Sequence, residues 1–428
     1  MFSENNFKEL SFLVYGLGST GKSVVNFFKK HKLKNYHVWD DINKNLYKSK
    51  RPQKLIEALK KVNFIVLSPG VSLNKTKNKK KLNKFKNKII TDIDLFFLLK
   101  RPHKSIVVTG TNGKSTTCKI LNHLLNKNKF KSLLGGNIGT PILNLKIKKN
   151  NYIVIEASSF QLSHSKFIKP DYALLLNITN DHLDWHGNMK NYINSKFKIF
   201  ENQKKNQYSL IDFKNKSEFK KRNFLGKLVV PKINSYLKLK SKIKNFYIKL
   251  DINDENMSYV LTLAKLLNIS DSAFIKSLGS FKGLPHRYEI FLKKNNCTFI
   301  NDSKATTYQS TKFALRNSKN IFWIVGGLPK KNDKIDLKYL KKKIIKAYLI
   351  GRHTNFFKKQ IRKHLSFNIS GSLKNSIIQI LKDIKIFKKK NNTILFSPAS
   401  ASFDQFLNFE KRGEKFKKLS QYYARKLI

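Results

Sequence analysis

Short apolar runs alternate along the chain with polar or glycine-rich turns, a pattern that predicts an α/β protein. The first run, SFLVY, ends at the turn GLGSTG, after which Val24, Val25, Phe27 and Phe28 recur at helical spacing. The apolar runs YHVW and NFIVL follow further along. This order of strand, glycine turn, helix and strand predicts a Rossmann-like parallel sheet in the first part of the chain.

A second block repeats the same order of elements. The run SIVVT leads into the turn GTNGK and the helical stretch STTCKILNHLLNK, and two further apolar runs, in YIVIEASS and YALLLNITNDH, end in polar residues. Parallel strands end at one edge of a sheet, where α/β proteins bind ligands, so we expect these polar residues to share that edge. Residues 203–249 are rich in Lys and Asn, and the pattern predicts strands and loops there without fixing their bounds.

A third block contains the apolar runs of CTFINDS, NIFWIVGG, AYLIG and TILFSPAS, separated by helical stretches. At 428 residues the chain exceeds the size of a single hydrophobic core. We therefore expect three domains: a Rossmann-like domain over 1–101, a central P-loop ATPase-like domain over 102–283, and a Rossmann-like α/β domain over 284–428. No Pro- or Gly-rich linker marks these boundaries.

Composition narrows the class of protein. Hydrophobic residues make up 40% of the chain, which is enough for a globular fold, and its two cysteines are far apart in sequence. With no apolar leader and no run long enough to cross a bilayer, the pattern predicts a cytoplasmic protein without a membrane partner.

The charge of the chain is strongly positive. Lys and Arg number 87 against 26 Asp and Glu, a formal net charge of +61, which would attract polyanions. The lysines are dispersed among Asn, Ile and Phe, as in KTKNKKKLNKFKNK, and dispersed charge is typical of solvated surface. We therefore expect no nucleic-acid partner, and a nucleic-acid-binding ATPase remains the alternative from another functional class.

The turn between the first strand and helix of the second block is a candidate phosphate-binding loop. Glycines let backbone N–H groups approach phosphate oxygens, Lys114 would neutralise the β- and γ-phosphates, and Ser115 would bind Mg²⁺. The loop is shorter than the G-x-x-x-x-G-K-[ST] pattern, but the strand before it and the helix after it favour ATP binding over a plain glycine turn. The predicted ATP-binding residues of this loop are Gly110, Thr111, Asn112, Gly113, Lys114, Ser115 and Thr116.

The first block carries a second glycine pattern. Gly16, Gly18 and Gly21 form G-x-G-x-x-G, and Asp40 and Asp41 follow the second strand. This pattern suits NAD, but nothing else in the chain resembles a hydride-transfer site. We favour a substrate that contains a nucleoside diphosphate.

Polar residues at two strand ends of the second block are candidates for metal binding. Glu156 ends one apolar run, and Asp181 and His182 follow another, where they could hold Mg²⁺ or simply cap turns. His182 and His186 also have the spacing of a zinc pair, but no H-E-x-x-H glutamate or cysteine pair accompanies them. In the third block, NDSKAT and SPASASFD suit recognition of an amino-acid carboxylate or, alternatively, cap helices.

In this order, GTNGKST, GGNIGTP, EASSFQL, NITNDHLD, GLPHR, NDSKAT and SPASASFDQFLNFEKRG resemble the motifs of the muramyl ligase family over essentially the whole chain. The third-block motifs are similar to those of the branch that adds D-glutamate to UDP-N-acetylmuramoyl-L-alanine. The resemblance implies an ATP-dependent ligase of peptidoglycan precursor synthesis that forms an acyl phosphate. It also implies two Mg²⁺ ions and small-molecule substrates, and we expect a monomer.

The resemblance assigns roles to individual positions. The expected UDP-substrate residues are Gly18, Ser19, Thr20, Gly21, Asp40, Asp41, Ser68, Asn137 and His182. Besides the phosphate loop, ATP is expected to meet Asn253, Arg287, Asp302 and Lys304. The expected metal ligands are Ser115, Glu156, His182 and Lys196, the last as a carbamate, and the catalytic residues are Lys114, His182 and Lys196. D-Glutamate is expected at Thr306, Lys330, Ser402 and Phe409.

Three positions depart from the family pattern. Ile252 replaces the histidine of a His-Asn-x-x-Asn motif, Leu328 and Pro329 precede Lys330 in place of a more polar loop, and Thr307 replaces an asparagine. These departures bear on substrate contacts rather than on phosphoryl transfer. The alternatives within the family are a sister ligase, such as a folylpolyglutamate-type enzyme, and a catalytically inactive homologue. The first block argues against the former, and the joint presence of Lys114, Glu156, His182 and Lys196 argues against the latter.

Overall fold

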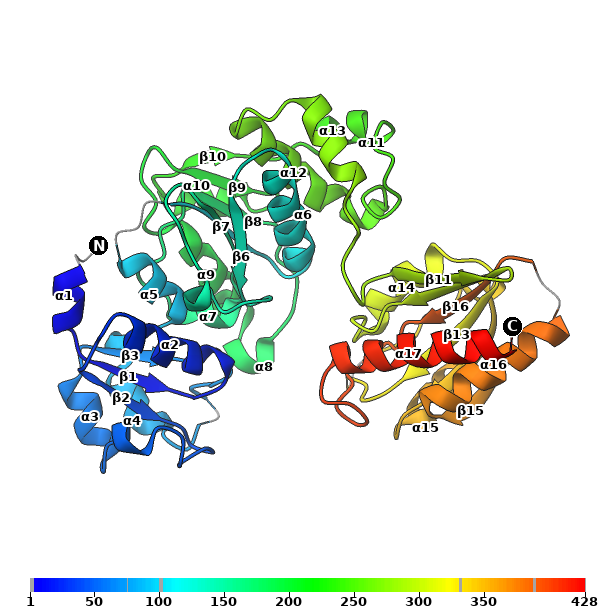
Figure 1. The fold of residues 1–428 in the computed structure, drawn as a ribbon, viewed down its shortest axis with the longest axis horizontal. Coiled ribbons are helices and arrows are strands. Elements are labelled where there is room, and N and C mark those ends of the chain that lie inside the picture. Colours follow the sequence, from blue (N-terminus) through cyan, green and yellow to red (C-terminus); the bar gives the residue numbers. More distant parts are fainter. Residues whose placement is uncertain (1–3, 75, 100–102, 331–332, 388–389, 428) are drawn as a thin grey trace. The chain divides into compact units, whose positions relative to one another are not determined.

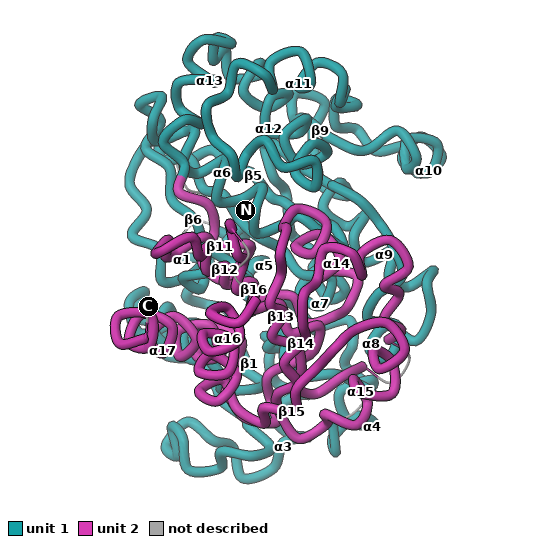
Figure 2. Tube along the Cα trace, turned by 90° about the vertical axis from the view of Figure 1, so that its right-hand side faces the viewer, with its two compact units in different colours: residues 1–281 teal, residues 282–428 magenta. Residues whose placement is uncertain are grey.

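The computed structural model describes residues 4–74, 76–99, 103–330, 333–387 and 390–427. These residues form three sheets with helices between their strands (Figure 1). The chain divides into two compact units, Met1–Phe281 and Lys282–Ile428, which are coloured separately in Figure 2. The first unit contains two of the sheets and the second contains one. The predicted boundary after residue 101 lies outside the described residues, and that after residue 283 lies close to the division between the units.

The N-terminal sheet is parallel with strand order β2-β1-β3-β4. Its strands are β1 (Phe12–Tyr15), β2 (Tyr36–Trp39), β3 (Phe64–Leu67) and β4 (Ile89–Ile90). Its helices are α1 (Glu4–Glu9), α2 (Ser19–Lys30), α3 (Leu55–Lys61), α4 (Lys79–Lys84) and α5 (Asp92–Leu98), with short 3-10 turns η1 (Lys48–Lys50) and η2 (Lys86–Lys88). The three strands predicted from apolar runs are confirmed, whereas β4 has only two residues and gives no run to detect.

The central sheet is parallel with order β10-β9-β8-β5-β7-β6. Its strands are β5 (Lys104–Thr109), β6 (Ser132–Gly136), β7 (Tyr152–Glu156), β8 (Tyr172–Leu175), β9 (Tyr208–Ile211) and β10 (Lys227–Val229). Its longer helices are α6 (Lys114–Lys127), α7 (Ser159–His164), α9 (Met189–Phe197), α10 (Lys216–Lys221), α11 (Ile233–Lys240), α12 (Asp254–Leu266) and α13 (Asp271–Gly279). The shorter turns are α8 (Leu183–His186), η3 (Ile142–Asn144), η4 (Lys198–Phe200) and η5 (Asp251–Asn253). The stretch whose bounds the sequence left open therefore supplies β9 and the edge strand β10.

The C-terminal sheet has the order β11-β12-β16-β13-β14-β15 and is parallel except for β11, which pairs with β12 in the antiparallel sense. Its strands are β11 (Glu289–Lys294), β12 (Cys297–Asn301), β13 (Ile321–Gly326), β14 (Ile344–Ile350), β15 (Phe367–Gly371) and β16 (Asn392–Phe396). Its helices are α14 (Tyr308–Arg316), α15 (Thr354–Ile361), α16 (Leu373–Phe387) and α17 (Phe409–Leu427), with the turn η6 (Lys341–Lys343). The α/β class with three sheets confirms the predicted fold class. No helix among the described residues is long and apolar enough to cross a bilayer.

The two sheets of the first unit share one hydrophobic core. Its buried residues come from both sheets and include Phe12 of β1 and Val107 of β5, and helix α2 packs against η3 of the central part. Apolar contact between the two halves explains why they form one compact unit.

Two buried carboxylates of α5 add polar links between the same halves. Asp94 accepts hydrogen bonds from the Ser165 hydroxyl at 2.7 Å and from the backbone N–H of Phe167 at 2.7 Å. Asp92 accepts one from Gln161 at 3.1 Å, and Gln161 also closes the capping box of α7 with Ser158. Helix α5 is thereby joined to the segment that follows Glu156.

The turn after β1 depends on the absence of a side chain at Gly21. A Cβ atom there would lie 1.9 Å from the carbonyl oxygen of Gly16, whereas one at Gly18 would meet nothing within 4 Å. We expect Gly21→Ala to lower the free energy of unfolding by on the order of 1–3 kcal/mol, the usual cost of overpacking. Gly18→Ala should change it by less than about 1 kcal/mol. Urea unfolding of both variants checks this, and equal losses would contradict it.

Burial makes the stability contribution of Asp92 depend on pH. Burial, with a smaller effect of nearby Asp94, raises the pKa of Asp92 from 3.8 to about 6, so the folded state binds more protons than the unfolded state between these values. The free energy of unfolding of the native chain should therefore fall, relative to that of Asp92→Asn, as pH rises from about 4 to about 6. The change should be ~3 kcal/mol, from about 1.4 kcal/mol per pKa unit.

Urea unfolding of the native chain and of Asp92→Asn across this pH range measures the difference. The control is Glu57→Gln on α3, which removes one carboxylate at an exposed position. A constant difference between the native chain and Asp92→Asn would contradict the raised pKa.

Candidate active site

The predicted phosphate loop lies between β5 and α6, at the carboxyl edge of the central sheet. Gly113 caps the helix with φ of 83°, a left-handed conformation that favours glycine. The Lys114 ammonium donates hydrogen bonds to the carbonyl oxygens of Gly110, at 2.8 Å, and Thr111, at 2.9 Å. The loop thus holds its lysine against its own backbone, next to the first N–H groups of α6. Ser115 is half-buried and Thr116 buried in the first turn of that helix.

The segment after β8 fastens this loop in place. The backbone N–H of Asn112 donates to the Asn177 side-chain oxygen at 2.9 Å, and that of Thr111 donates to the Asn177 carbonyl at 3.0 Å. The Thr111 hydroxyl accepts from the backbone N–H of Thr179 at 2.9 Å and lies 3.0 Å from the Tyr192 hydroxyl of α9. Asn177 and Thr179 belong to the motif NITNDHLD, in which no pattern distinguishes them as residues that hold the loop. Their role could have been inferred only from the adjacency of β5 and β8.

Helix α12 contacts the phosphate loop from another side. A Cβ atom at Gly113 would lie 2.0 Å from the side-chain oxygen of Asn256, so the two positions are in close contact. Asn253, one of the predicted ATP-binding residues, is buried and donates to the carbonyl oxygen of Tyr247 at 2.6 Å. The His-Asn-x-x-Asn motif has lost its histidine here but keeps both asparagines. Of these two, Asn256 is the one that lies against the phosphate loop.

Glu156, at the end of β7, has one carboxylate oxygen bonded and one left over. Asn137 donates its side-chain N–H to Oε1 at 2.8 Å, and Oε2 is buried without a hydrogen-bond partner among the described residues. A buried carboxylate oxygen lacking a partner is costly unless a cation meets it. The donor set of Glu156 with the hydroxyl of Ser115 is therefore chemically suited to Mg²⁺. The hydrogen bond from Asn137 to Glu156 also joins a residue expected to meet the UDP substrate to one expected to bind a metal ion.

Lys196 on α9 is almost completely buried, with 1% of its surface exposed. Burial lowers the pKa of its ammonium well below the ordinary value, and Lys114 lowers it further, while Asp181 opposes them. Its Nζ lies 4.6 Å from the centre of the Tyr192 ring. Burial therefore favours the neutral, nucleophilic form of the amine over the charged form.

His182 precedes α8 in a left-handed conformation with φ of 52°. Its Nε2 lies 3.4 Å from the Asp181 carboxylate, and its ring packs edge-on against Phe160 at 4.8 Å. His186, the other member of the zinc-like pair, is buried with Nε2 3.0 Å from the Ser159 hydroxyl. Within the described ranges, no group of three or more His, Cys, Asp or Glu residues is placed to hold a metal ion. A metal at this edge would thus need the ligands supplied by Ser115, a modified lysine or the substrates.

The turn predicted to hold a diphosphate lies between β1 and α2, where Gly18, Ser19, Thr20 and Gly21 begin the helix. Ser68, after β3, donates its hydroxyl to the Gly16 carbonyl at 2.7 Å and so braces the turn. Asp40 accepts backbone hydrogen bonds from Leu17 at 2.6 Å and Asn43 at 2.7 Å. Asp40 and Ser68 therefore hold the backbone at the start of this turn, Leu17 and Gly16, by hydrogen bonds.

Asp41 lies in a separate polar cluster. It accepts hydrogen bonds from the side chains of Tyr15 at 2.8 Å, Trp39 at 3.0 Å, Thr76 at 2.8 Å and Asn78 at 2.9 Å. Burial raises the pKa of Asp41, but these four bonds outweigh burial and leave the pKa below its ordinary value. The carboxylate therefore stays charged and positions the loop that contains Thr76 and Asn78.

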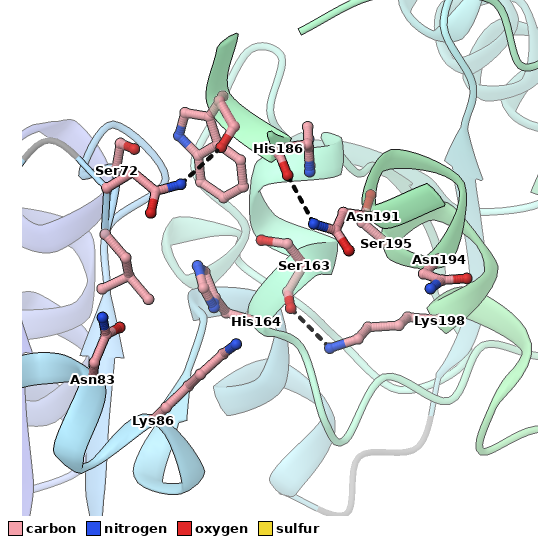
Figure 3. A pocket seen from close by; sticks show the side chains of 13 residues that line it. Ser72, Asn83, Lys86, Ser163, His164, His186, Asn191, Asn194, Ser195 and Lys198 are labelled. Atoms are coloured by element: carbon pink, nitrogen blue, oxygen red, sulfur yellow. Dashed lines mark hydrogen bonds between the residues drawn. The ribbon is translucent and has the colours of Figure 1, made fainter. Parts of the chain in front are cut away.

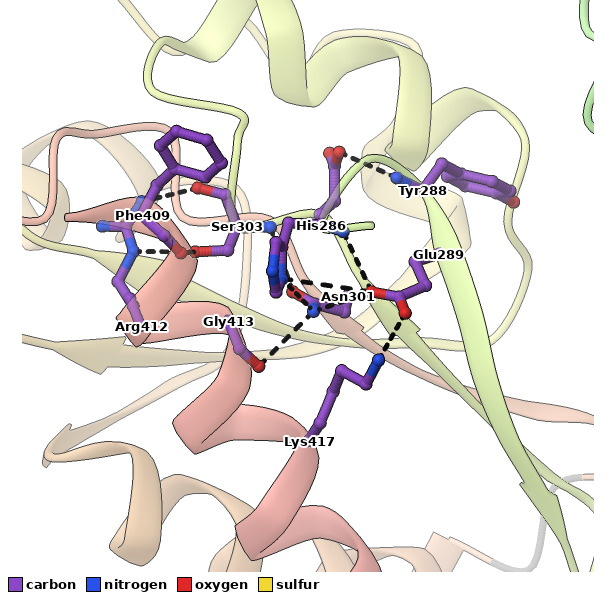
Figure 4. A network of polar contacts seen from close by, with 10 residues as sticks. His286, Tyr288, Glu289, Asn301, Ser303, Phe409, Arg412, Gly413 and Lys417 are labelled. Atoms are coloured by element: carbon purple, nitrogen blue, oxygen red, sulfur yellow. Dashed lines mark hydrogen bonds and ion pairs between the residues drawn. The ribbon is translucent and has the colours of Figure 1, made fainter. Parts of the chain in front are cut away.

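In the second unit, a buried network joins the motifs GLPHR, NDSKAT and FEKRG (Figure 4). Asn301 donates to the ring of His286 at 2.9 Å and to Glu289 at 3.1 Å, and Glu289 is also paired with Lys417 of α17. Gly413 permits the contact, since a Cβ atom there would lie 2.2 Å from the His286 ring. Burial lowers the pKa of His286, which favours a neutral ring that accepts the Asn301 bond.

Arg412 links three of the third-block motifs. Its guanidinium donates to the Ser303 hydroxyl at 3.1 Å and to the carbonyl oxygens of Ser303 at 2.8 Å and Ser400 at 3.0 Å. Ser303 in turn donates to the carbonyl of Phe409, over whose ring Lys304 lies at 3.7 Å. Lys304 and Phe409 were predicted as site residues, but Arg412 was not, because an arginine in a basic helix gives no sign of being buried.

Asp302, a predicted ATP-binding residue, is buried within the motif NDSKAT. It accepts the Ser397 hydroxyl at 2.7 Å and the backbone N–H of Tyr288 at 3.1 Å. Burial raises the pKa of Asp302 to about 7, although these bonds and the charge of half-buried Arg287 oppose the shift.

Two of the residues predicted to bind D-glutamate, Lys330 and Ser402, lie on neighbouring loops. Leu328 exchanges two backbone hydrogen bonds of 2.9 Å with Ala401, which brings the segment that carries exposed Lys330 alongside buried Ser402. Thr306 is half-buried just before α14, whose N-cap is Thr307. The substitution at Thr307 therefore retains a capping side chain.

The Mur ligase middle domain matches residues 108–284. A UDP-N-acetylmuramoylalanine–D-glutamate ligase of Rickettsia felis is 35% identical, over 97% of this chain and 97% of its own. The protein of the same name from Francisella tularensis is 33% identical, over 98% of this chain and 97% of its own.

Solved structures show the same fold at low sequence identity. UDP-N-acetylmuramate–alanine ligase MurC from Thermotoga maritima has a TM-score of 0.57 at 15% identity, covering 97% of this chain and 100% of its own. The MurF ligase of Thermotoga maritima in complex with ADP also has a TM-score of 0.57, at 16% identity, covering 98% of this chain and 97% of its own. With curated relatives above 30% identity over nearly the whole length, the chain belongs to the Mur ligase family.

Proposed function

We propose that this chain uses ATP to join D-glutamate to UDP-N-acetylmuramoyl-L-alanine, the reaction for which its relatives are named. The observation that carries the proposal is the arrangement at the central sheet edge. There a phosphate loop holding Lys114, the unpartnered oxygen of Glu156 and the buried amine of Lys196 occur in one compact unit. These are the groups that phosphoryl transfer to a carboxylate requires.

The proposed reaction has two steps. A carboxylate oxygen of the alanyl substrate attacks the γ-phosphorus of ATP, the bond to the β-phosphate oxygen breaks, and ADP leaves. The amine of D-glutamate then attacks the acyl carbon, loses a proton, and expels inorganic phosphate from a tetrahedral intermediate. Lys114 would exchange its bonds to Gly110 and Thr111 for phosphate oxygens and offset the charge that gathers between the two anions. The backbone N–H groups at the start of α6 would help bind these oxygens.

Two Mg²⁺ ions are part of the proposal. Ser115 and Glu156 would hold one, and His182 and a carbamate on Lys196 would hold the other. Bound there, Mg²⁺ would supply Lewis-acid stabilisation of the transferring phosphoryl group. Support for the first site comes from the unpartnered Oε2 of Glu156.

Support for the carbamate comes from the environment of Lys196. Because burial lowers the pKa of its ammonium, the neutral nitrogen is available to attack CO₂. The N–C bond forms, the amine gives up a proton, and the product is an anion with two oxygen ligands. The carbamate would thereby convert a position unsuited to metal binding into a suitable one.

The remaining assignments complete the proposal. The uridine substrate would meet Asn137, His182 and the glycine turn braced by Ser68. ATP would also meet Asn253, Arg287, Asp302 and Lys304, and D-glutamate would meet Thr306, Lys330, Ser402 and Phe409. We propose that the protein acts in the cytoplasm, where ATP is supplied, and as a monomer, since all these residues belong to one chain. Both cysteines are free and buried, as suits a reducing compartment.

Release of inorganic phosphate from ATP tests the reaction. With UDP-N-acetylmuramoyl-L-alanine present, we expect release with D-glutamate and at least a hundredfold less with L-glutamate, L-alanine or a diamino acid, because the donor groups of the amino-acid site fix one stereoisomer. Release with another amino acid would contradict the substrate assignment but keep the chemistry. Hydrolysis stimulated by oligonucleotides, with no dependence on any amino acid, would contradict the ligase and favour the nucleic-acid-binding ATPase.

Substitution of Lys196 tests the carbamate. Lys196→Ala should lower kcat by at least a hundredfold, and acetate or another short carboxylate should restore part of the activity by replacing the missing oxygen ligands. The matched control is Lys190→Ala on the exposed face of the same helix, which should retain activity. Full activity of Lys196→Ala, or a loss that no carboxylate relieves, would contradict the role as a carbamate.

A further inference from the structure

A cavity of about 350 Å³ lies in the first unit between the loop after β3 and helices α7, α8 and α9 (Figure 3). Ser72, Asn83 and Lys86 line it from the N-terminal half, and His164, Trp185 and Lys198 line it from the central half. The volume falls in the range of small-molecule sites. The cavity is therefore large enough for a metabolite rather than only for single water molecules.

Its lining is polar and cationic. Two lysines and two histidines line the cavity, and none of the described lining residues is acidic. Lys198 donates hydrogen bonds to the carbonyl oxygens of Ser163 at 2.8 Å and Ser165 at 3.2 Å, which fixes its charge at the cavity wall. In Figure 3 the ammonium of Lys86 points toward the ring of His164. Such a wall attracts anions and repels cations.

Two polar atoms at this cavity are buried without a partner in the described parts of the chain. They are the hydroxyl oxygen of Ser72 and Nε2 of His164, and they come from opposite halves of the unit. Leaving a buried donor without a partner costs free energy, and a ligand toward which these two side chains turned would remove that cost by accepting from both atoms.

The electrostatic surroundings of His164 agree with an anion site. Burial lowers the pKa of His164 to about 4, and the nearby charges of Lys198, Lys86, His186 and Lys166 lower it further. The ring is therefore neutral at physiological pH and keeps one N–H donor. A neutral donor surrounded by cations is suited to an oxyanion.

The cavity is separate from the sites assigned above. Its lining includes none of the phosphate loop, the glycine turn after β1, Glu156 or Lys196. It does include Ser195, the neighbour of Lys196 on α9, so a bound molecule would contact the helix that positions the proposed carbamate.

We propose that this cavity is a binding site for a small oxyanion, a free carboxylate or phosphate metabolite, held by Lys86, His164, Ser72 and Lys198. The ligand would accept hydrogen bonds from the Ser72 hydroxyl on one side and from His164 on the other. It would thereby join the loop after β3 to α7 and α9. The site is additional to those of the proposed ligase substrates and does not depend on the ligase assignment.

Titration calorimetry with inorganic phosphate and, separately, with malonate at fixed ionic strength tests the proposal on the full chain. We expect saturable binding of at least one anion, weakened at least tenfold by Lys86→Met and by His164→Phe. Phosphate can also bind the phosphate loop, but that loop is unchanged in both variants. The difference in binding between the native chain and each variant therefore reports on the cavity. If the variants weaken the saturable binding of malonate alone, the cavity is a carboxylate site. If they weaken that of phosphate alone, it is a phosphate site.

The matched control is Lys84→Met, which removes one exposed lysine from neighbouring α4 without touching the cavity lining. It should bind as the native chain does, and an equal loss in Lys84→Met would mean attraction to the overall charge and would overturn the site. Ser72→Ala removes only a hydroxyl without a partner, so it should fold normally and bind at least threefold more weakly. Unchanged binding in Ser72→Ala, Lys86→Met and His164→Phe, or no saturable binding of either anion to the native chain, would also overturn it.

Discussion

The hydrogen bonds between the phosphate loop and the end of β8 are the constraint on which the rest of the site depends. A loop of glycines and small polar residues has little side-chain packing of its own, and its conformational entropy favours disorder. Asn177 and Thr179 supply donors and acceptors to Asn112 and Thr111, and Tyr192 adds a contact from α9. The same bonds therefore place α9, with its buried lysine, at a fixed distance from the loop.

Buried charge is a feature that occurs in both units. Lys196, Asp302 and Arg412 are all buried, and burial shifts the pKa of each toward the neutral form. Each is compensated differently: Lys196 lies near Asp181 and an aromatic ring, Asp302 accepts two hydrogen bonds, and Arg412 donates to backbone carbonyls. Removing one partner of such a group costs more than the bond itself, because the remaining group stays buried.

The sequence predicted best those parts of the molecule in which a local pattern reflects a local requirement. The glycines of the phosphate loop and the apolar runs of β1, β5 and β13 are of this kind, since each element needs those residue types in consecutive positions. Strands β4, β6, β11 and β15 were missed, and each lies at the edge of its sheet. Strand β4 has two residues, and the runs SLLGG, EIFLKK and FNISG of the other three are short or partly polar. Edge strands face solvent and lose the continuous apolar pattern of central strands.

Contacts between distant residues were beyond the reach of sequence patterns. Asn256 and Gly113 are in close contact although they are more than a hundred residues apart, and no pattern in either segment predicts this contact. Asp41 was predicted to face a ligand from its place after a strand, yet four side chains converge on it. A strand-end carboxylate can bind a ligand or organise a loop, and the choice depends on which neighbours the fold brings to it.

The position of Lys114 bears on the thermodynamics of nucleotide binding. A solvent-exposed lysine would lose about 2 kcal/mol of rotamer entropy when a phosphate fixed it in place. Lys114 already donates to two carbonyl oxygens of its own loop, so much of that entropy is lost on folding. Nucleotide binding then exchanges one set of acceptors for another, and its selectivity rests on how well a polyphosphate competes with two fixed carbonyls. In a chain of net charge +61, where cations that attract phosphate are abundant, this competition distinguishes the loop from the rest of the surface.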